Sequence, residues 1–183
     1  SNADRTVIAY SDSGNSSHGT AIVGTVSGTS ISYGSAAVFE SAQVSSVSAT
    51  FDSSNNKVVI AYRDHGNSDH GTAIVGTVSG TSISFGTAVV FNSATTTGVR
   101  CTFDSNSNKV FISFDEHSGN TIKGIVGTVS GTGISFGTAV QIEPALATSN
   151  YTATGFDSST NKVIVVYGDS GDSNKGKVSV GTI

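Results

Sequence analysis

The chain has 183 residues and a formal net charge of −4, with 12% charged residues, one cysteine and neither methionine nor tryptophan. No basic run is present, which excludes the electrostatic footprint of a nucleic-acid-binding protein. The longest apolar runs are far shorter than the roughly 20 residues that span a bilayer. Abundant Gly, Ser, Thr and Val favour short strands and tight turns. We predict an all-β protein with no nucleic-acid partner and no membrane partner.

The chain opens on Ser1-Asn2-Ala3, which resembles the remnant of a cleaved expression tag, so we expect a fragment of a longer protein. The rest, residues 4–183, is predicted to be a single repeat domain. The segment from His18 to Ser32 recurs letter for letter from His70 to Ser84, 52 residues later, and returns in altered form further on. A period of this size is typical of propeller blades and solenoid units. We place the repeats at about residues 4–44 (partial), 45–96, 97–148 and 149–183 (partial).

Each complete repeat is predicted to hold four strands, A to D, which we define on the second repeat. Strand A covers residues 47–51, with alternate residues on one face. Strand B covers residues 57–63 and is nearly all apolar, as expected of a strand covered on both faces. Strand C covers residues 72–79. A Gly80-Thr81 hairpin leads into strand D, residues 82–91.

Strand D is the longest predicted strand. Four apolar residues alternate with small ones in it and should share one face: Ile83, Phe85, Val89 and Phe91. No segment repeats apolar residues at helical spacing for long enough to predict a helix.

The repeat resembles the blades of NHL-type propellers. Those blades also run as an inner strand, a turn rich in Asp and Asn, an apolar second strand that ends in an aromatic and an acid, and then a hairpin. The matching residues here run from Phe51-Asp52 through Asn56-Lys57 to Tyr62-Arg63-Asp64. The resemblance implies a β-propeller of four-stranded antiparallel blades, with about four repeats per chain.

The chain begins inside a repeat, so the first repeat lacks strand A and the last lacks strand D. Three arrangements fit: a four-bladed ring with two three-stranded blades, a larger ring made by two chains, or an array that continues beyond the fragment. We predict four blades per chain, with a homodimer as the expected assembly. A linear β-solenoid or β-repeat array is the alternative, because stacked repeats need no closure.

The loops between strands B and C are the longest and most variable, and variable loops on a repeated scaffold are the usual place for a binding site. On a propeller they emerge on the same face as the D-to-A loops. They begin at Asp12, Asp64, Asp115 and Asp169 and contain all four histidines of the chain. The candidate ligand-binding face consists of Asp12, His18, Asp64, His65, Asp69, His70, Asp115, Glu116, His117, Asp169 and Asp172.

Two interpretations of this face remain open. Carboxylates and Asn carbonyls suit Ca²⁺ and imidazole suits Zn²⁺, so a weak Ca²⁺ site is one interpretation. However, no loop matches the EF-hand spacing, and no pair of histidines has a recognised zinc spacing. The simpler interpretation is that Asp-x-Gly and Asn-Ser segments form turns, with side chains bonded to the local backbone. We therefore predict no cofactor and assign no metal ligands.

Other repeated residues have structural explanations. An Asx-turn accounts for the acid that follows each strand A, namely Asp52, Asp104 and Asp157. A solvated basic rim opposite the histidines accounts for Lys57, Lys109 and Lys162, with Arg5 in register. Packing between blades, rather than stacking on a sugar, accounts for the aromatics that end strand B: Tyr10, Tyr62, Phe114 and Tyr167. We expect Cys101 to be a small core residue.

The expected function is that of a non-catalytic repeat module. We predict an adhesion or interaction scaffold of an extracellular, cell-surface or particle-surface protein, with a protein or carbohydrate partner. The alternative is a lectin-like or cation-dependent propeller that binds its ligand multivalently. A glycosidase would need paired carboxylates, and a sialidase an arginine cluster, whereas Arg5, Arg63 and Arg100 occupy different registers. No G-x-S-x-G segment is present, so we predict that the chain is not an enzyme.

Overall fold

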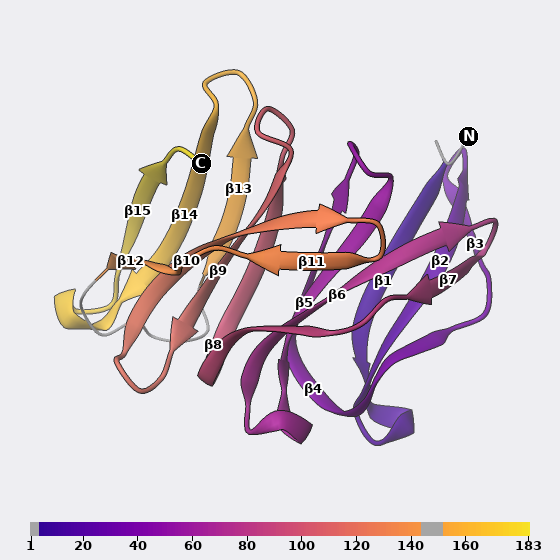
Figure 1. Cartoon of the computed structure of the whole chain (residues 1–183), viewed down its shortest axis with the longest axis horizontal. Helices are drawn as coiled ribbons and strands as arrows, with labels where there is room; N and C mark the ends of the chain where they lie inside the picture. The colour runs from indigo at the N-terminus through magenta and orange to yellow at the C-terminus, as the bar shows by residue number, and fades with distance from the viewer. Residues whose placement is uncertain (1–3, 144–151) are drawn as a thin grey trace.

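The computed structural model describes residues 4–143 and 152–183, and these residues form an all-β protein. Residues 1–3 and the predicted boundary between the third and fourth repeats lie outside the described residues. All strand pairs are antiparallel, as predicted. The described strands form one continuous 12-stranded sheet and one separate 3-stranded sheet. Two shared strands divide the larger one into three small sheets, and together with the last they lie in a row from the N-terminal to the C-terminal repeat (Figure 1).

The first two sheets meet in one shared strand. The first contains β1 (Arg5–Asp12), β2 (His18–Ser27), β3 (Ser30–Tyr33) and the beginning of β4 (Ala37–Asp52). The second contains the end of β4, then β5 (Lys57–Asp64), β6 (His70–Ser79), β7 (Ser82–Phe85) and the beginning of β8 (Val89–Asp104).

The third and fourth sheets follow the same order of strands. The third contains the end of β8, then β9 (Lys109–Glu116), β10 (Thr121–Ser130), β11 (Gly133–Phe136) and β12 (Val140–Glu143). The fourth contains β13 (Ala153–Asp157), β14 (Lys162–Asp169) and β15 (Lys175–Gly181). Single 3-10 turns, η1 (Ser13–Asn15), η2 (His65–Asn67) and η3 (Ser170–Asp172), connect strands B and C of the first, second and fourth repeats.

The strands β4 and β8 bridge neighbouring repeats. Each has 16 residues, and each pairs at its start with strand C of one repeat and at its end with strand B of the next. The register shifts midway, where Ser46 and Gly98 have φ of 50° and 58°. Such a bulge bends a strand and increases its twist. The expected D-to-A loops are therefore absent at both described junctions.

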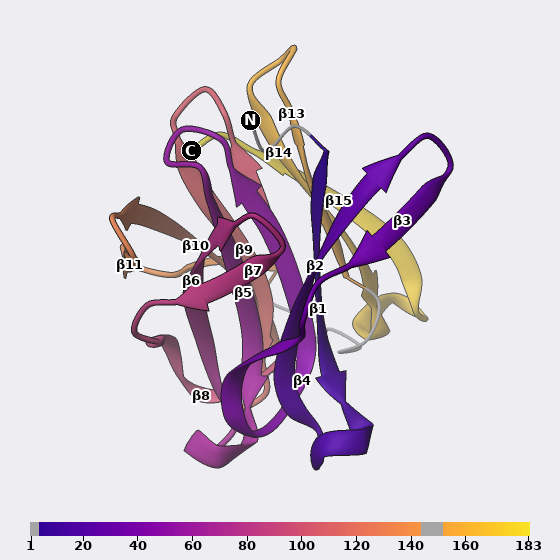
Figure 2. The same ribbon diagram turned by 90° about the vertical axis from the view of Figure 1, so that its right-hand side faces the viewer.

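The sheets do not close into a ring. Among the described strands, β1 pairs only with β2, and β15 pairs only with β14. The first and fourth sheets lie at opposite ends of the row, as the view along the row also indicates (Figures 1 and 2). The all-β antiparallel architecture is confirmed, whereas the described chain is an open row of sheets.

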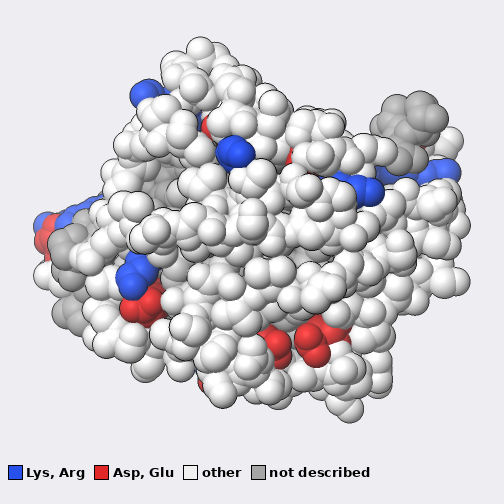
Figure 3. Space-filling model, in the orientation of Figure 1, with Lys and Arg blue, Asp and Glu red and all other residues white. Residues whose placement is uncertain are grey.

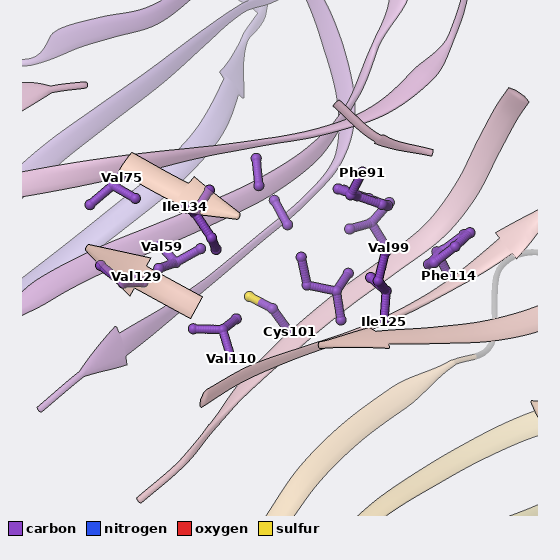
Figure 4. Close-up of a cluster of buried hydrophobic side chains, with 13 residues drawn as sticks. Val59, Val75, Phe91, Val99, Cys101, Val110, Phe114, Ile125, Val129 and Ile134 are labelled. Atoms are coloured by element: carbon purple, nitrogen blue, oxygen red, sulfur yellow. The ribbon is translucent and has the colours of Figure 1, made fainter. Parts of the chain in front are cut away.

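The core lies between the sheets rather than within any one of them. Strand β5 shows this directly, because Ile60 and Tyr62 pack towards the first repeat while Val59 and Ala61 pack towards the third. The prediction that strand B is covered on both faces is thus correct. The cluster between the second and third repeats is the largest, and its side chains meet from both sheets (Figure 4). Burying one such aliphatic side chain contributes about 1.5–3 kcal/mol.

The prediction of one continuous strand D is wrong. Strand β7 ends at Phe85 and β8 begins at Val89, and the chain between them changes face. Ile83 and Phe85 pack towards the first repeat, whereas Val89 and Phe91 pack towards the third. A Cβ atom on Gly86 would lie 1.9 Å from the Thr132 carbonyl oxygen, so the hairpin of the next repeat fits only against a glycine. The third repeat has the same break, between Phe136 and Val140, although a Cβ atom on Gly137 would meet nothing closer than 3.9 Å, so the hairpin contact accompanies the break without causing it.

Candidate functional site

The B-to-C loops lie in a row along one edge of the molecule, and the A-to-B turns lie along the opposite edge (Figure 1). In the space-filling view, acidic atoms gather towards the lower edge and basic atoms towards the upper edge (Figure 3). The loops stay separate. Within residues 4–143 and 152–183, no group of three or more His, Cys, Asp or Glu side chains could hold a metal ion.

Three of the loops share one geometry. The carboxylates of Asp12, Asp64 and Asp169 accept a hydrogen bond from the backbone N–H two residues ahead, at 3.1, 2.9 and 2.8 Å. Each loop then ends in two residues with left-handed φ: Ser16 and Ser17, Ser68 and Asp69, Ser173 and Asn174. These are the side-chain bonds expected of turn-forming Asp residues. The shape of each loop is therefore fixed by bonds within the loop itself.

The third loop differs, and the predicted equivalence of Asp115 with the other loop acids is wrong by one residue. Glu116 pairs with Thr121 across the hairpin, just as Asp64 pairs with His70. Glu116 therefore occupies the loop position, and Asp115 stands in register with Arg63. The loop between β9 and β10 is one residue shorter than that between β5 and β6, which explains why it forms no 3-10 turn. The sequence also contains this deletion, since Tyr62 and Phe114 are 52 residues apart whereas Gly76 and Gly127 are 51 apart.

Asp115 is a buried carboxylate with no hydrogen-bond partner among the described residues. Its side chain is 3% exposed, and neither carboxylate oxygen is bonded. Burial raises the pKa of Asp115 to about 6, although the positive charge of Arg100 opposes the shift. The neighbouring strand residue on the same face, Ser113, bonds Thr154 of the fourth repeat at 2.5 Å. Asp115 thus lies on the side of β9 that faces the fourth repeat.

The second loop contains a bonded chain of polar side chains. His65 Nδ1 lies 2.6 Å from an Asp69 carboxylate oxygen, and His65 Nε2 lies 2.9 Å from Ser45 Oγ. This is the connectivity of a Ser-His-Asp triad. Arg63 contacts the other Asp69 oxygen at 2.7 Å, and its hydrogen bond holds the pKa of Asp69 below the usual range. Sequence reasoning missed Ser45, because the bulge in β4 brings it to the loop.

The remaining acids of the face are paired with cations of their own repeat. Glu116 bonds Lys123 at 2.8 Å, and Asp172 bonds Lys175 at 2.8 Å. Asp169 pairs with Lys177, which lowers the pKa of its carboxyl. Lysine and arginine thus pair with the carboxylates of Asp69, Glu116, Asp169 and Asp172, whereas those of Asp12 and Asp64 accept bonds from the backbone of their own loops. The other histidines are separate: His18 and His70 begin β2 and β6, and His117 lies exposed in the third loop.

The opposite edge repeats two simple contacts. Lys57, Lys109 and Lys162 donate to the hydroxyls of Thr77, Thr128 and Thr182 at 3.0, 2.9 and 2.7 Å, and Arg5 donates to Thr25. The acids after strand A accept backbone N–H bonds from the turn, as predicted for Asp52, Asp104 and Asp157. Bonds from Ser159 and Thr160 lower the pKa of Asp157 to about 2.

The strand B aromatics face neighbouring repeats. Tyr62 and Phe114 are fully buried, and Tyr167 is nearly so. The Tyr62 ring lies 5.1 Å from that of Phe39, and the Phe114 ring lies 5.2 Å from that of Phe91. These residues serve the packing between sheets, and Tyr10 is partly exposed on the outer side of the first sheet.

Two grooves lie away from the loop edge. One, of about 410 Å³, is lined by residues including Arg5, Val7 and Phe51, and it lies between β1 and the end of β4. The other, of about 460 Å³, is lined by residues including Phe111 and Val140. Neither borders Ser45 or His65, so the described grooves place no substrate beside the bonded chain of the second loop.

No protein-family model matches the chain, and a search of curated proteins finds no match. Within the part of the chain that the structure describes, no helix is long and apolar enough to cross a membrane. Function is therefore inferred from the residues of the chain itself.

Proposed function

We propose that the chain is a non-catalytic interaction scaffold of an extracellular, cell-surface or particle-surface protein, with a protein or carbohydrate partner. One observation carries the proposal. The first, second and fourth repeats present the same closed loop along one edge, each fixed by an Asp carboxylate on a backbone N–H. A rigid loop displayed at regular intervals suits a partner that is itself extended or repeated, because several weak contacts then act together.

The internal ion pairs support a scaffold over a cation-dependent lectin. Four of the loop carboxylates already pair with cations: Asp69 with Arg63, Glu116 with Lys123, Asp169 with Lys177 and Asp172 with Lys175. A Ca²⁺ site needs six to eight oxygen ligands, and binding here would first have to break these pairs.

The second loop raises the question of catalysis. A triad serine acts only if its base is oriented by a carboxylate and if oxyanion donors face the reacting carbonyl. The Asp69 carboxylate shares its charge with Arg63, and the side chains of His65 and Asp69 are 27% and 31% exposed. We attribute the bonded chain to stabilisation of the loop.

We propose further that the four sheets are successive blades of a β-propeller. Two features support this interpretation: each complete sheet orders its strands A, B, C, D, and consecutive sheets pack face to face. A linear β-repeat array is the alternative. Electron microscopy of the assembled protein separates the two, because only a propeller shows a ring with a central channel.

A binding screen tests the function. We would probe arrays of glycans and of extracellular proteins with the chain, with and without EDTA. We expect binding that survives EDTA, falls at least several-fold in the double variant H65A/D69A and persists in the matched opposite-edge variant K57A/K109A. Loss of all binding with EDTA would instead establish the cation-dependent alternative.

A fluorophosphonate probe tests the absence of catalysis separately. This reagent labels activated serines, and we expect no labelling above that of the Ser45→Ala variant. Rapid labelling that depends on both Ser45 and His65 would show that the chain is an enzyme.

A further inference from the structure

The two terminal sheets each leave an apolar face uncovered. On the first sheet, the outer face includes Ile8, Tyr10 and Ile22, and we call it the head face. Ile8 is 40% exposed. On the fourth sheet, the outer face includes Val166, Val178 and Val180, and we call it the tail face. Val178 and Val180 are 60% and 61% exposed. Apolar patches of this kind commonly mark interaction sites.

The head face repeats residues that are buried inside the molecule. In repeat register, Ile8, Tyr10 and Ile22 correspond to Ile60, Tyr62 and Ile74. The latter three are 0%, 0% and 3% exposed, because they pack against the first repeat. The strand pairing is also the same, since Ile8 pairs with Ile22 as Ile60 pairs with Ile74. The head face therefore has the same residues, in the same strand pairing, as the face of the second repeat that the first repeat covers.

The tail face corresponds to the other face of the second repeat, the one that packs against the third repeat. By strand pairing, Val166 pairs with Val178 as Ala61 pairs with Ala73, and Ile164 pairs with Val180 as Val59 pairs with Val75. All four residues of the second repeat are 0% exposed, because they pack against the third repeat. The fourth repeat therefore presents the surface that the second repeat uses to bind its successor.

The centres of both surfaces are uncharged, and charge appears only where the strands end, at Asp12 on the head face and at Asp157 and Lys162 on the tail face. The alternate residues of β14 and β15 on the tail face are apolar or glycine from Ile164 to Gly168 and from Gly176 to Val180. On the head face, those of β1 from Thr6 to Tyr10 are uncharged. Burial of the two faces against each other would desolvate few polar side chains, which keeps its cost low.

We propose that the head face of a second copy of this chain packs on the tail face, in a head-to-tail contact that continues the stacking of the repeats. Such a contact joins two different surfaces, so repetition closes a ring if the rotation permits and otherwise builds a filament. The proposal is independent of what the loop edge binds.

The contact between two chains, which we call the seam, should be weaker than the contacts between neighbouring repeats within one chain. Inside the chain, Phe39 and Phe91 of the bridging strands fill the contact beside Tyr62 and Phe114. A Cβ atom on Gly71 would lie 2.4 Å from the Phe91 ring, whereas one on the corresponding Gly176 would meet nothing within 4 Å. The fourth repeat thus offers a space that no aromatic ring fills, and we expect the assembly to dissociate on dilution.

Light scattering after size-exclusion chromatography tests the proposal with one variant on each face. We would compare the unaltered chain with Ile8→Glu on the head face, Val178→Glu on the tail face and Val90→Glu as a control. Val90 is also an exposed valine, at 40%, but it lies on the second repeat and on neither terminal face. Circular dichroism and thermal unfolding would verify that all variants fold.

The unaltered chain and Val90→Glu should form complexes of two or more 18.4-kDa chains that dissociate on dilution. In a closed two-chain ring or a filament, each face variant alone loses its seams and runs as a monomer. A mixture of the two variants retains one intact pair of faces and should form a complex of two chains and no larger. This last result is specific to a head-to-tail contact.

Three results would overturn the proposal. The unaltered chain could remain a monomer at every concentration tested. Only one of the two face variants could affect assembly, which indicates contact between identical faces. Alternatively, the mixed variants could fail to associate although each is folded, which would place the contact elsewhere.

Discussion

The ring of Phe91 lies directly over Gly71, and a Cβ atom on that glycine would be 2.4 Å from Phe91 Cε2. The first repeat contains the same relationship between Phe39 and Gly19, at 2.3 Å. In both repeats the glycine stands in strand C and the aromatic in the bridging strand. The glycine therefore provides the space into which the next strand inserts its aromatic side chain.

Substitution of Gly71 by alanine should destabilise the protein. The added methyl group would displace the Phe91 ring, and overpacking of a core costs about 1–3 kcal/mol. Gly176→Ala is a matched control, because it adds the same group at the same position of strand C with nothing within 4 Å. Urea unfolding should show a lower midpoint for Gly71→Ala and an unchanged or higher midpoint for Gly176→Ala. Equal midpoints would show that the Phe91 ring can move away at no cost.

Asp115 should make stability fall as the pH rises. Because burial raises its folded pKa from 3.8 to about 6, the folded state holds the proton more tightly than the unfolded state. Stability is therefore full below about pH 4, declines between about pH 4 and 6, and stays reduced above that range. Asp115→Asn should be more stable than the unaltered chain at pH 7 by up to roughly 3 kcal/mol, and equally stable at pH 4. Unfolding by urea at a series of pH values measures both.

Asp157→Asn is the matched control for that pH series. The folded pKa of Asp157 is lowered to about 2, so its contribution is present above the unfolded pKa of about 4 and is lost as the pH falls towards 2. This variant should be less stable than the unaltered chain at pH 7, the opposite of Asp115→Asn. The same sign for both substitutions would contradict the assigned environments.

Cys101 should not react with thiol reagents in the native state. Its backbone N–H and its thiol both lie near Ser48 Oγ of the neighbouring repeat, at 3.1 and 3.4 Å. Burial raises the pKa of the thiol to about 11, so little thiolate is present at pH 8. A colourimetric thiol assay should report no free thiol until denaturant is added, and then one per chain. Immediate reaction under native conditions would show that strands β4 and β8 separate readily.

Ser46→Gly should stabilise the bulge of β4. Ser46 has φ of 50°, in the left-handed region that favours glycine, and its register equivalent in β8 is Gly98, with φ of 58°. We expect a gain of about 0.5–1 kcal/mol for Ser46→Gly and a loss of similar size for Gly98→Ser. Thermal unfolding of the two single variants measures both. A loss in both would indicate that Ser46 contributes a contact larger than its backbone strain.

The features of the fold that depend on local periodicity could be predicted from the sequence. The predicted bounds of strand B, residues 57–63, are correct to within one residue, because β5 ends at Asp64. The prediction succeeded because a short apolar run in a repeat of this size is typical of a strand covered on both faces. The break before Val89 escaped prediction, because Gly86-Thr87-Ala88 continues the alternation of small residues and nothing in that pattern marks a change of face.

The candidate site was less accessible to sequence reasoning. The loops lie where the pattern placed them, except that the third begins one residue later than predicted. The 52-residue offset from Lys57 to Lys109 already places Asp115 in register with Arg63, so the sequence contained the information that would have avoided this error. The contact between Ser45 and His65 depends on the geometry of a bulge, which no spacing rule encodes. A contact between two side chains that are 20 residues apart in the sequence, such as Ser45 and His65, could therefore be found only in the structure.

The bridging strands determine how such an array can be divided or lengthened. Since β4 and β8 each belong to two sheets, a cut between two repeats severs a strand and removes hydrogen bonds from both. Loss of one repeat should consequently weaken its neighbour, and unfolding should spread along the row rather than stop at a repeat. An engineer who wishes to extend the array should insert 52 contiguous residues in phase, starting at any position, instead of joining repeats end to end.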